Sequence, residues 1–274
     1  MKAIARAFAT ALVAVLCACG GGGGAGGSAG GPGVTPQVGR VESISLLSTN
    51  TGYNYPINVY LPPQYDANAQ AHLPVIFAVD GDAQFGYDGN ATRFDALKQA
   101  LQQRGTGAIL VGVGGTVRRN TDFLPFGSIA YHAFLTQELV PAIDARYRTD
   151  TAQRILSGLS YGGTITFLAF TYEGATTPTF RYFWSTETAA PNGMPQQLFD
   201  AEAAMQAAVQ GRAVPVTLFF AGANNFNGPL VNQLYTQVLS RNYAGLDVEQ
   251  VTYATTHVGA DLPAFNEALT RFVH

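Results

Sequence analysis

Ser160 lies on a tight bend between two apolar segments, in the sequence GLSYG. The run Arg154–Ser157 before it is typical of a short buried strand, and the run Gly163–Tyr172 after it is typical of a buried helix. A sharp strand-to-helix turn forces strained backbone angles on its central residue and brings the flanking residues so close that glycine is needed there. We therefore interpret Gly158 and Gly162 as the residues that permit the turn, and Ser160 as a nucleophile exposed at the start of a helix.

A serine hydroxyl is a weak nucleophile at neutral pH and needs a general base, for which histidine is best suited. The chain has four histidines, of which His72 and His132 precede the serine. In hydrolases with this pentapeptide the base follows the nucleophile along the chain. His274 is the last residue, whereas His257 lies between the last predicted strand and the last predicted helix, so we expect His257 to be the base.

Strand-like and helical runs alternate over most of the chain, which predicts an α/β fold with a mostly parallel sheet. Several of the strand-like runs are continuously apolar, as in strands covered on both faces. The first two runs have no helix between them, which predicts an antiparallel pair at the edge of the sheet. The predicted strands are Val41–Leu47, Ile57–Leu61, Leu73–Val79, Ala108–Val113, Arg154–Ser157, Tyr182–Ser185, Val216–Phe220 and Val248–Tyr253. The predicted helices are Phe94–Arg104, Ile129–Ala145, Gly163–Tyr172, Pro195–Gln210, Leu230–Arg241 and Ala264–Val273.

Five blocks in this order resemble the α/β-hydrolase superfamily, specifically the esterases related to esterase D and to the enterochelin (ferric siderophore) esterases. The blocks are LPVIFAVDGDAQF, VGVGGTVRRNTDFLP with its Arg119-x-x-Asp122 segment, FLTQELVPAIDARYRTD, RILSGLSYGG and HVGADLPAFNEALTRFV. The resemblance covers most of residues 55–274. It implies a single α/β-hydrolase domain with a central, mostly parallel eight-stranded sheet flanked by helices.

Two backbone amides are candidates for the oxyanion hole. The amide of Tyr161 lies at the start of the helix after the serine, where N–H groups favour negative charge. The resemblance implies that the second donor is the amide of Asp82, in the loop after the third strand, where Gly81 lets the backbone turn inward. We expect Asp80 to hold this loop through side-chain bonds to the backbone.

The residue that orients the histidine is less clear from the sequence. The family resembled here usually places a carboxylate after the seventh strand, but this chain has Asn224 and Asn225 there. Glu187 follows the sixth strand, at the same end of the sheet, and is our first candidate for the acid. The alternatives are Asn224 or Asn225 as a neutral partner, or a serine–histidine pair with no third member. Asp261 is close to the histidine in sequence, but we expect it to cap the last helix.

Residues 1–19 have the features of a bacterial lipoprotein signal peptide. Lys2 and Arg6 precede an uncharged run, Ala7–Cys19, which is too short to span a bilayer as a helix. The run ends in LCAC, which resembles the lipobox of bacterial lipoproteins. In that family cleavage precedes the last cysteine and a diacylglyceryl group is attached to its sulfur, which implies lipidation of Cys19.

The alternative for this segment is plain secretion with cleavage near Ala18 or Gly20. Residues 20–39 begin with GGGGGAGGSAGGPG, which has ten glycines and nothing large, and we interpret them as a flexible tether. Residues 40–274 are the predicted catalytic domain. The expected location is the bacterial cell envelope, on the outer membrane or the periplasmic face, with membrane attachment through the lipid.

Composition argues against several other classes of protein. The only cysteines are Cys17 and Cys19, so residues 40–274 have no disulfide and no thiol nucleophile. The chain has few histidines to serve as zinc ligands, so we expect no metal. The sequence GVGGT lacks the third glycine of a dinucleotide-binding fingerprint, so we expect no cofactor. Without Lys2 and Arg6, the chain has 13 Lys and Arg residues and 18 Asp and Glu residues, which gives a formal charge of −5. It has no basic run, so we expect no nucleic-acid partner.

These patterns predict a serine carboxylic-ester hydrolase that acts on a small-molecule ester through an acyl-enzyme. Three alternatives remain open. An acyltransferase on the same fold would use an alcohol in place of water, and a ferric siderophore hydrolase would have the narrower chemistry of the family resembled here. The third is a non-catalytic surface protein that keeps the fold, for which the missing carboxylate after the seventh strand is the one supporting feature.

Overall fold

The structure, a computed structural model, describes residues 39–190 and 194–273. All of these residues fall within one compact unit. The predicted signal peptide, with Cys17 and Cys19, and nearly all of the predicted tether lie outside the described residues. None of the helices in the described part of the chain combines the length and the apolar character needed to span a bilayer.

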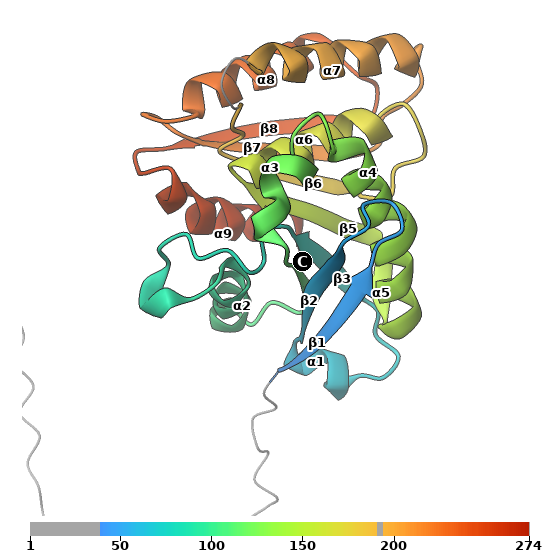
Figure 1. Ribbon diagram of the computed structural model, residues 1–274, viewed down its shortest axis with the longest axis vertical. Helices are drawn as coiled ribbons and strands as arrows, with labels where there is room; N and C mark the ends of the chain where they lie inside the picture. The colour runs from blue at the N-terminus through green and yellow to red at the C-terminus, as the bar shows by residue number, and fades with distance from the viewer. Residues whose placement is uncertain (1–38, 191–193, 274) are drawn as a thin grey trace, which may run out of the picture. The chain divides into compact units, whose positions relative to one another are not determined.

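Eight strands form one sheet, in the order β1-β2-β4-β3-β5-β6-β7-β8 (Figure 1). Strand β2 pairs antiparallel with β1 and with β4, and the remaining pairs are parallel. The predicted fold class and the antiparallel pair at the sheet edge are therefore confirmed. The strands are β1 (Arg40–Leu47), β2 (Asn54–Leu61), β3 (Leu73–Ala78), β4 (Ile109–Val113), β5 (Thr149–Leu159), β6 (Tyr182–Thr186), β7 (Thr217–Ala223) and β8 (Asp247–Tyr253).

The helices connect the strands and cover both faces of the sheet. They are α1 (Pro63–Ala67), α2 (Arg93–Arg104), α3 (Arg119–Asp122), α4 (Ser128–Ala133), α5 (Val140–Arg146), α6 (Tyr161–Glu173), α7 (Pro195–Val209), α8 (Gly228–Ser240) and α9 (Asp261–Phe272). The predicted helix Ile129–Ala145 is interrupted by a π-helical segment, Phe134–Leu139. Pro141 follows this segment, has no N–H and would crowd the carbonyl four residues earlier, so a regular α-helix is disfavoured there.

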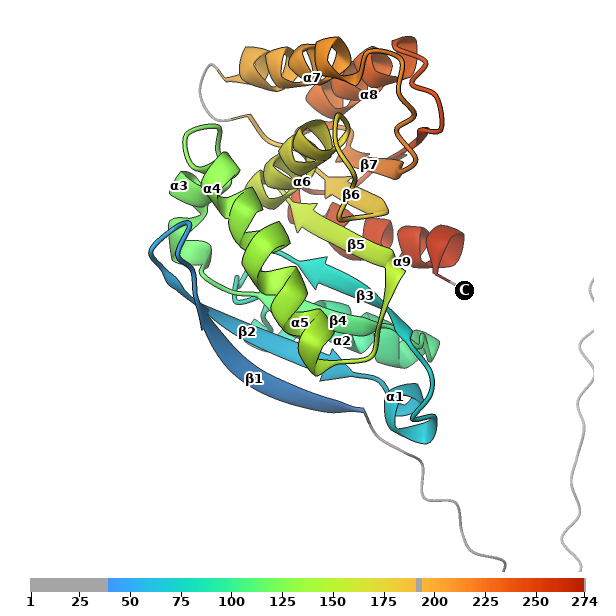
Figure 2. The same cartoon turned by 90° about the vertical axis from the view of Figure 1, so that its right-hand side faces the viewer.

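Two hydrophobic clusters lie on opposite faces of the sheet, and the alternation along β3 shows how. Val75, Phe77 and Val79 join the larger cluster, which includes side chains of helices α4 to α8. Ile76 and Ala78 join the other cluster, with side chains of α2 and α9. Figure 2 shows α5 and α6 on one side of the sheet and α2 and α9 behind it. Strands covered on both faces must be apolar at every position, which is the pattern seen in the sequence.

Because β3, β5, β6, β7 and β8 run in parallel, the loops that follow them meet at one edge of the sheet. The predicted oxyanion loop, nucleophile, acid and base follow β3, β5, β6 and β8, respectively. The sheet therefore gathers four segments that are far apart in the sequence.

Candidate active site

Ser160 occupies the bend between β5 and α6 with φ 63° and ψ −121°, a conformation that residues other than glycine rarely adopt. A β-carbon at Gly158 would lie 2.0 Å from the carbonyl oxygen of Gly162, so no side chain fits there. A β-carbon at Gly163 would lie 2.5 Å from the carbonyl oxygen of Thr186. Gly162 has more room, with its nearest neighbour at 3.0 Å. Close packing at this turn thus depends most on Gly158, the first glycine of the pentapeptide, and on Gly163, which directly follows the pentapeptide.

The carboxylate of Glu187 lies beside the imidazole of His257. Its Oε2 is 2.7 Å from Nδ1 of the ring. The glutamate is fully buried, whereas 29 % of the histidine side chain is exposed. Backbone amides of Ala223 and Asn227 donate to the two carboxylate oxygens, the second over 3.3 Å. These donors hold the carboxylate in place and satisfy its charge in a buried position.

Asn227 supports this pair and was not predicted. Its side-chain Nδ2 donates to the backbone carbonyl of Glu187 over 3.2 Å and lies 3.3 Å from Nδ1 of His257. A carboxylate at 2.7 Å accepts only from a protonated Nδ1, so Nδ1 carries the hydrogen and has no lone pair for the amide. Asn227 therefore bonds to the glutamate backbone rather than to the ring.

The two asparagines that we predicted as neutral partners are not brought to the histidine. Asn224 and Asn225 are exposed, and neither side chain hydrogen-bonds to His257. The turn from Ala223 to Phe226, closed by a 3.2 Å backbone bond, directs Asn227 inward instead. The three asparagines of this loop, Asn224, Asn225 and Asn227, lie within four residues of one another. The sequence predicted that the loop after β7 contributes to the site, but it does not reveal which asparagine faces His257.

The predicted oxyanion donors lie on two ordered segments. Tyr161 is the first residue of α6, where backbone amides lack helical acceptors. The loop before Asp82 is fixed by the amide of Gly81, which donates to Val113 over 2.8 Å. A β-carbon at Gly81 would lie 2.8 Å from the carbonyl carbon of Gly112, so this approach requires glycine. Neither the Asp82 amide nor the Tyr161 amide donates a hydrogen bond to another described residue.

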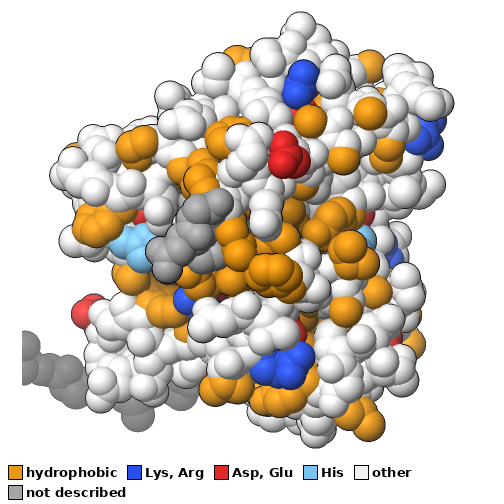
Figure 3. All heavy atoms as spheres, turned by 45° about the horizontal axis from the view of Figure 1, so that its top comes forward, with side chains coloured by type: hydrophobic (Ala, Val, Ile, Leu, Met, Phe, Trp, Pro, Cys, Tyr) orange, Lys and Arg blue, Asp and Glu red, His pale blue; other side chains and the backbone are white. Residues whose placement is uncertain are grey.

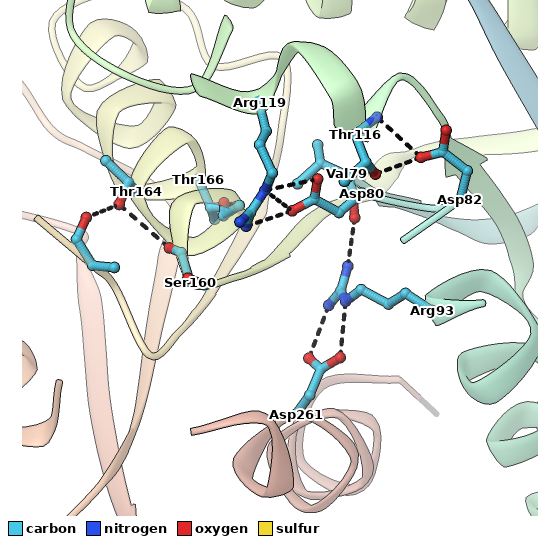
Figure 4. Close-up of polar contacts among 12 residues, drawn as sticks. Val79, Asp80, Asp82, Arg93, Thr116, Arg119, Ser160, Thr164, Thr166 and Asp261 are labelled. Atoms are coloured by element: carbon cyan, nitrogen blue, oxygen red, sulfur yellow. Dashed lines mark hydrogen bonds and ion pairs between the residues drawn. The ribbon is translucent and has the colours of Figure 1, made fainter. Parts of the chain in front are cut away.

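The side chain of Asp82 points away from the predicted oxyanion hole. Its carboxylate accepts hydrogen bonds from the amides of Gly115 and Thr116, at 2.9 and 3.1 Å. Figure 4 shows this carboxylate directed toward Thr116 and away from Ser160. The carboxylate thus anchors the loop after β4 and leaves the backbone of Asp82 as the part that could face an oxyanion.

We expected the side chain of Asp80 to hold the loop by bonding to the backbone. Instead, its carboxylate pairs with Arg119. The guanidinium Nη2 lies 2.9 Å from Oδ2, with the aspartate fully buried (Figure 4). Burial raises the pKa of the Asp80 carboxyl, while the charge of Arg119 acts in the opposite direction. Arg119 also lies over the rings of Tyr161 and Phe85, at 5.0 and 5.3 Å from their centroids.

The segment Arg119-x-x-Asp122 does not form an ion pair within itself. Asp122 accepts from the guanidinium of Arg118 over 2.8 Å and from the hydroxyl of Tyr55 over 2.6 Å. The two residues of the segment thus serve different neighbours, and only the arginine reaches the site.

Arg93 links three segments of the site, and Figure 4 shows its bonds to two of them, at Val79 and Asp261. Its guanidinium is fully buried and pairs through two nitrogens with Asp261, at 2.8 and 3.0 Å. It also donates to the carbonyl of Val79, at the end of β3, and to the carbonyl and hydroxyl of Ser157, three residues before Ser160. These bonds join the strand before the oxyanion loop, the strand before the nucleophile and the segment after the histidine.

Our expectation that Asp261 caps the last helix was wrong. Asp261 is the first residue of α9 rather than its cap, and no side-chain cap bond is found there. Its carboxylate is turned inward to Arg93 and also accepts from the hydroxyl of Tyr87. An inward ion pair of this kind depends on a partner 168 residues away, which local sequence cannot reveal.

Three strands end at the site in a strained residue. Asp80, Ser160 and Glu187 follow β3, β5 and β6, and have φ of 57°, 63° and 50°. Each such residue costs on the order of 1–3 kcal/mol and persists only where its surroundings enforce the conformation. Strain at three adjacent strand ends marks this edge as the functional part of the sheet.

The predicted nucleophile and the predicted base, Ser160 and His257, both line a cavity of about 500 Å³, and a cavity of about 430 Å³ lies on the other side of the His257 loop. The first is lined by Arg119, Ser160, Tyr161, Ala189, Ala190, Phe226, Asn227 and His257. In the space-filling view hydrophobic side chains gather in the middle of the visible face, and charged side chains are sparse there (Figure 3).

Among residues 39–190 and 194–273, no group of three or more His, Cys, Asp or Glu side chains is arranged to hold a metal ion.

Known protein structures share this architecture. An IroE-like serine hydrolase from Shewanella oneidensis aligns with a TM-score of 0.67 at 20% identity, over 83% of this chain and 78% of that one. The BES protein from Bacillus cereus aligns with a TM-score of 0.68 at 19% identity, over 88% and 96% of the two chains. The siderophore hydrolase EstA from Aspergillus nidulans aligns with a TM-score of 0.67 at 14% identity, over 84% and 93%.

The chain has the α/β-hydrolase fold. Residues 48–175 also match the model of a family described as "Putative esterase", which supports an esterase family of the α/β-hydrolase type. No curated protein matches the sequence. The matched part of this α/β-hydrolase includes Ser160 and the oxyanion loop, whereas Glu187 and His257 lie beyond it.

Proposed function

We propose that this α/β-hydrolase is a serine carboxylic-ester hydrolase that works through an acyl-enzyme. One observation carries the proposal: Ser160, held in a strained turn, lines the same cavity as His257, whose ring is paired with a buried carboxylate. The match of residues 48–175 to an esterase family supports the reaction class.

The geometry supports a role for each residue in this proposal. Glu187 accepts the hydrogen of Nδ1, so the other ring nitrogen, Nε2, is the one free to act as a base. His257 takes the proton of the Ser160 hydroxyl as the oxygen attacks the ester carbonyl, and Glu187 stabilises the imidazolium that forms. The backbone amides of Tyr161 and Asp82 donate to the oxyanion of the tetrahedral intermediate.

The first half of the cycle ends when the imidazolium gives its proton to the leaving alcohol, the bond from the acyl carbon to that alcohol breaks, and the acyl group stays on the serine oxygen. In the second half, His257 deprotonates a water molecule that attacks the acyl carbon. The bond to the serine oxygen then breaks, that oxygen takes the proton back from the imidazolium, and the acid is released. The helix α6, which starts directly after Ser160, adds a favourable dipole at the oxyanion.

Labelling with a fluorophosphonate probe tests this proposal. We expect the probe to modify Ser160, as mapped by mass spectrometry, and Ser160→Ala to lose both labelling and p-nitrophenyl ester hydrolysis. Circular dichroism and the thermal midpoint Tm check that the variant remains folded. Labelling of the Ser160→Ala variant at the wild-type level would show that the nucleophile lies elsewhere.

A ferric siderophore ester is the second candidate substrate, because one structural relative is a siderophore hydrolase. Comparison of kcat/KM for a ferric siderophore ester and for simple aryl esters distinguishes the two. A preference of at least two orders of magnitude for the siderophore would favour the narrower function.

We also propose that the chain is exported and held in the bacterial cell envelope by a lipid on Cys19. The support comes from the charged start, the short apolar run and the LCAC sequence of residues 1–19. Such an anchor would keep an esterase close to the membrane surface.

A further inference from the structure

We propose that the second cavity, on the other side of the His257 loop, binds the alcohol part of the ester and selects bulky alcohols without negative charge. This inference rests on the proposed function and specifies its substrate class. The cavity measures about 430 Å³ and is lined by Phe85, Gly86, Tyr87, Asp88, Thr256, Val258, Gly259, Leu262 and Pro263.

The second cavity lies next to the predicted base. Thr256 and Val258, which line it, are the residues on either side of His257. His257 itself lines the cavity that contains Ser160. The histidine loop therefore forms a shared wall between the two cavities.

A cation–π contact also connects a lining residue of the first cavity to a lining residue of the second. Arg119 lines the first cavity and Phe85 lines the second, and the guanidinium lies 5.3 Å from the centroid of the phenyl ring. The same guanidinium lies 5.0 Å from the ring of Tyr161, next to the nucleophile. The first cavity is thus lined by both the serine and the histidine, and the second cavity is lined by the two residues on either side of that histidine.

The chemistry of ester cleavage assigns an occupant to each cavity. The acyl carbon becomes bonded to Ser160, so the acyl group belongs in the cavity that the serine lines. The leaving oxygen receives its proton from His257, so the alcohol must extend past the histidine. The cavity flanked by Thr256 and Val258 is the space available in that direction.

The walls indicate which alcohols fit. The rings of Phe85 and Tyr87 have centroids 6.4 Å apart, and they form an aromatic wall. Tyr87 is fixed by its hydrogen bond to the buried carboxylate of Asp261, so the wall is ordered before substrate binds. Asp88 is the one charged side chain among the lining residues, and its carboxylate disfavours an anionic alcohol. A volume of this size accommodates an aromatic or branched aliphatic group.

Two ester series test the assignment. The first keeps an acetyl group and varies the alcohol from ethanol to benzyl alcohol to 2-naphthylmethanol, and the second keeps ethanol and lengthens the acyl chain. For the wild type we expect kcat/KM to rise with alcohol size. Leu262→Trp, which fills the cavity, should lower kcat/KM for 2-naphthylmethyl acetate at least about tenfold relative to ethyl acetate. It should leave the ratios within the acyl series unchanged.

Leu239→Trp is the matched control, because Leu239 is 47 % exposed on α8 and lines neither cavity. Phe85→Ala gives a second test that removes wall rather than adding bulk, and it should reduce the preference for aromatic over aliphatic alcohols. Asp88→Asn should raise kcat/KM for 4-carboxybenzyl acetate relative to benzyl acetate.

The outcomes separate this inference from the proposed function. Active enzymes whose alcohol ratios are the same in the wild type, Leu262→Trp and Phe85→Ala would overturn the alcohol site and leave the esterase intact. A shift in the acyl ratios alone would assign the cavity to the acyl group and overturn the inference as stated. A wild type with no hydrolysis and no labelling of Ser160 would overturn both.

Discussion

The carboxylate of Glu187 reaches Nδ1 of His257 at 2.7 Å, across 70 residues of sequence. The two residues follow β6 and β8, which are separated in the sheet only by β7. The loop after β7 passes between them and contributes the amides of Ala223 and Asn227 to the carboxylate. The candidate acid thus follows the strand before the one after which the family resemblance places a carboxylate, and the intervening loop supports it.

We predict that Glu187→Gln lowers kcat by about four orders of magnitude and changes KM little. An amide cannot stabilise the imidazolium, and it can present its N–H to Nδ1 and favour the wrong tautomer, as replacement of the triad aspartate by asparagine does in serine proteases. Steady-state kinetics with a p-nitrophenyl ester measures both constants.

Glu173→Gln is a matched control for this experiment. Glu173 is also a buried glutamate beside a histidine, with Oε1 2.8 Å from Nε2 of His132, but neither residue lines the catalytic cavity. We expect this variant to lose stability and keep kcat. A Glu187→Gln enzyme with wild-type kcat would exclude Glu187 as the acid.

Asn227→Ala should lower kcat by about tenfold and the free energy of unfolding by about 1 kcal/mol, because one hydrogen bond to the Glu187 carbonyl is lost. The backbone amide of residue 227 still donates to the carboxylate, so the loss is smaller than for removal of the acid. Asn225→Ala, the same change two residues earlier at an exposed position, is the control and should be nearly silent. Equal effects of the two substitutions would contradict a specific role for Asn227.

Arg93→Met should destabilise the fold by about 3–5 kcal/mol, because it leaves the buried carboxylate of Asp261 without its cation. Desolvation by itself would lower the pKa of Arg93, but the charge of Asp261 outweighs it and raises that pKa, so the guanidinium stays charged in the fold. The double variant Arg93→Met/Asp261→Leu should recover part of this loss. Urea unfolding of the wild type, both single variants and the double variant gives the coupling energy. Strictly additive losses would show that the pair contributes no coupling.

Cys19→Ser should release the protein from the membrane fraction of the producing cells. The three acyl chains of a mature lipoprotein hold a domain firmly, whereas one chain gives only marginal binding. Fractionation followed by immunoblotting measures the distribution, and Cys17→Ser is the control that should remain membrane-bound. Retention of Cys19→Ser in the membrane with unchanged electrophoretic mobility would argue against lipidation.

The local pattern of the sequence was enough to predict the sheet, because strands covered on both faces must be apolar throughout and the turns between them need glycine. It also led to the prediction of Ser160 as nucleophile, from the glycines at the bend, and of His257 as base, from its place after the serine and after the last strand. The structure places both residues at one cavity. Three interactions were beyond its reach: Arg93 with Asp261, Arg119 with Asp80, and Asn227 with the glutamate backbone. Each joins residues from separate segments of the chain, and the partners are set by three-dimensional packing rather than by spacing along the chain.

The positive φ at Ser160 means that one substitution can increase thermal stability and abolish catalysis at the same time. Glycine adopts φ 63° and ψ −121° without steric cost, so Ser160→Gly relieves strain at the same time as it removes the nucleophile. A variant library screened only for survival on heating would therefore enrich inactive glycine variants at this codon. Any effort to make the protein more durable has to hold this position constant and gain its stability from elsewhere in the chain.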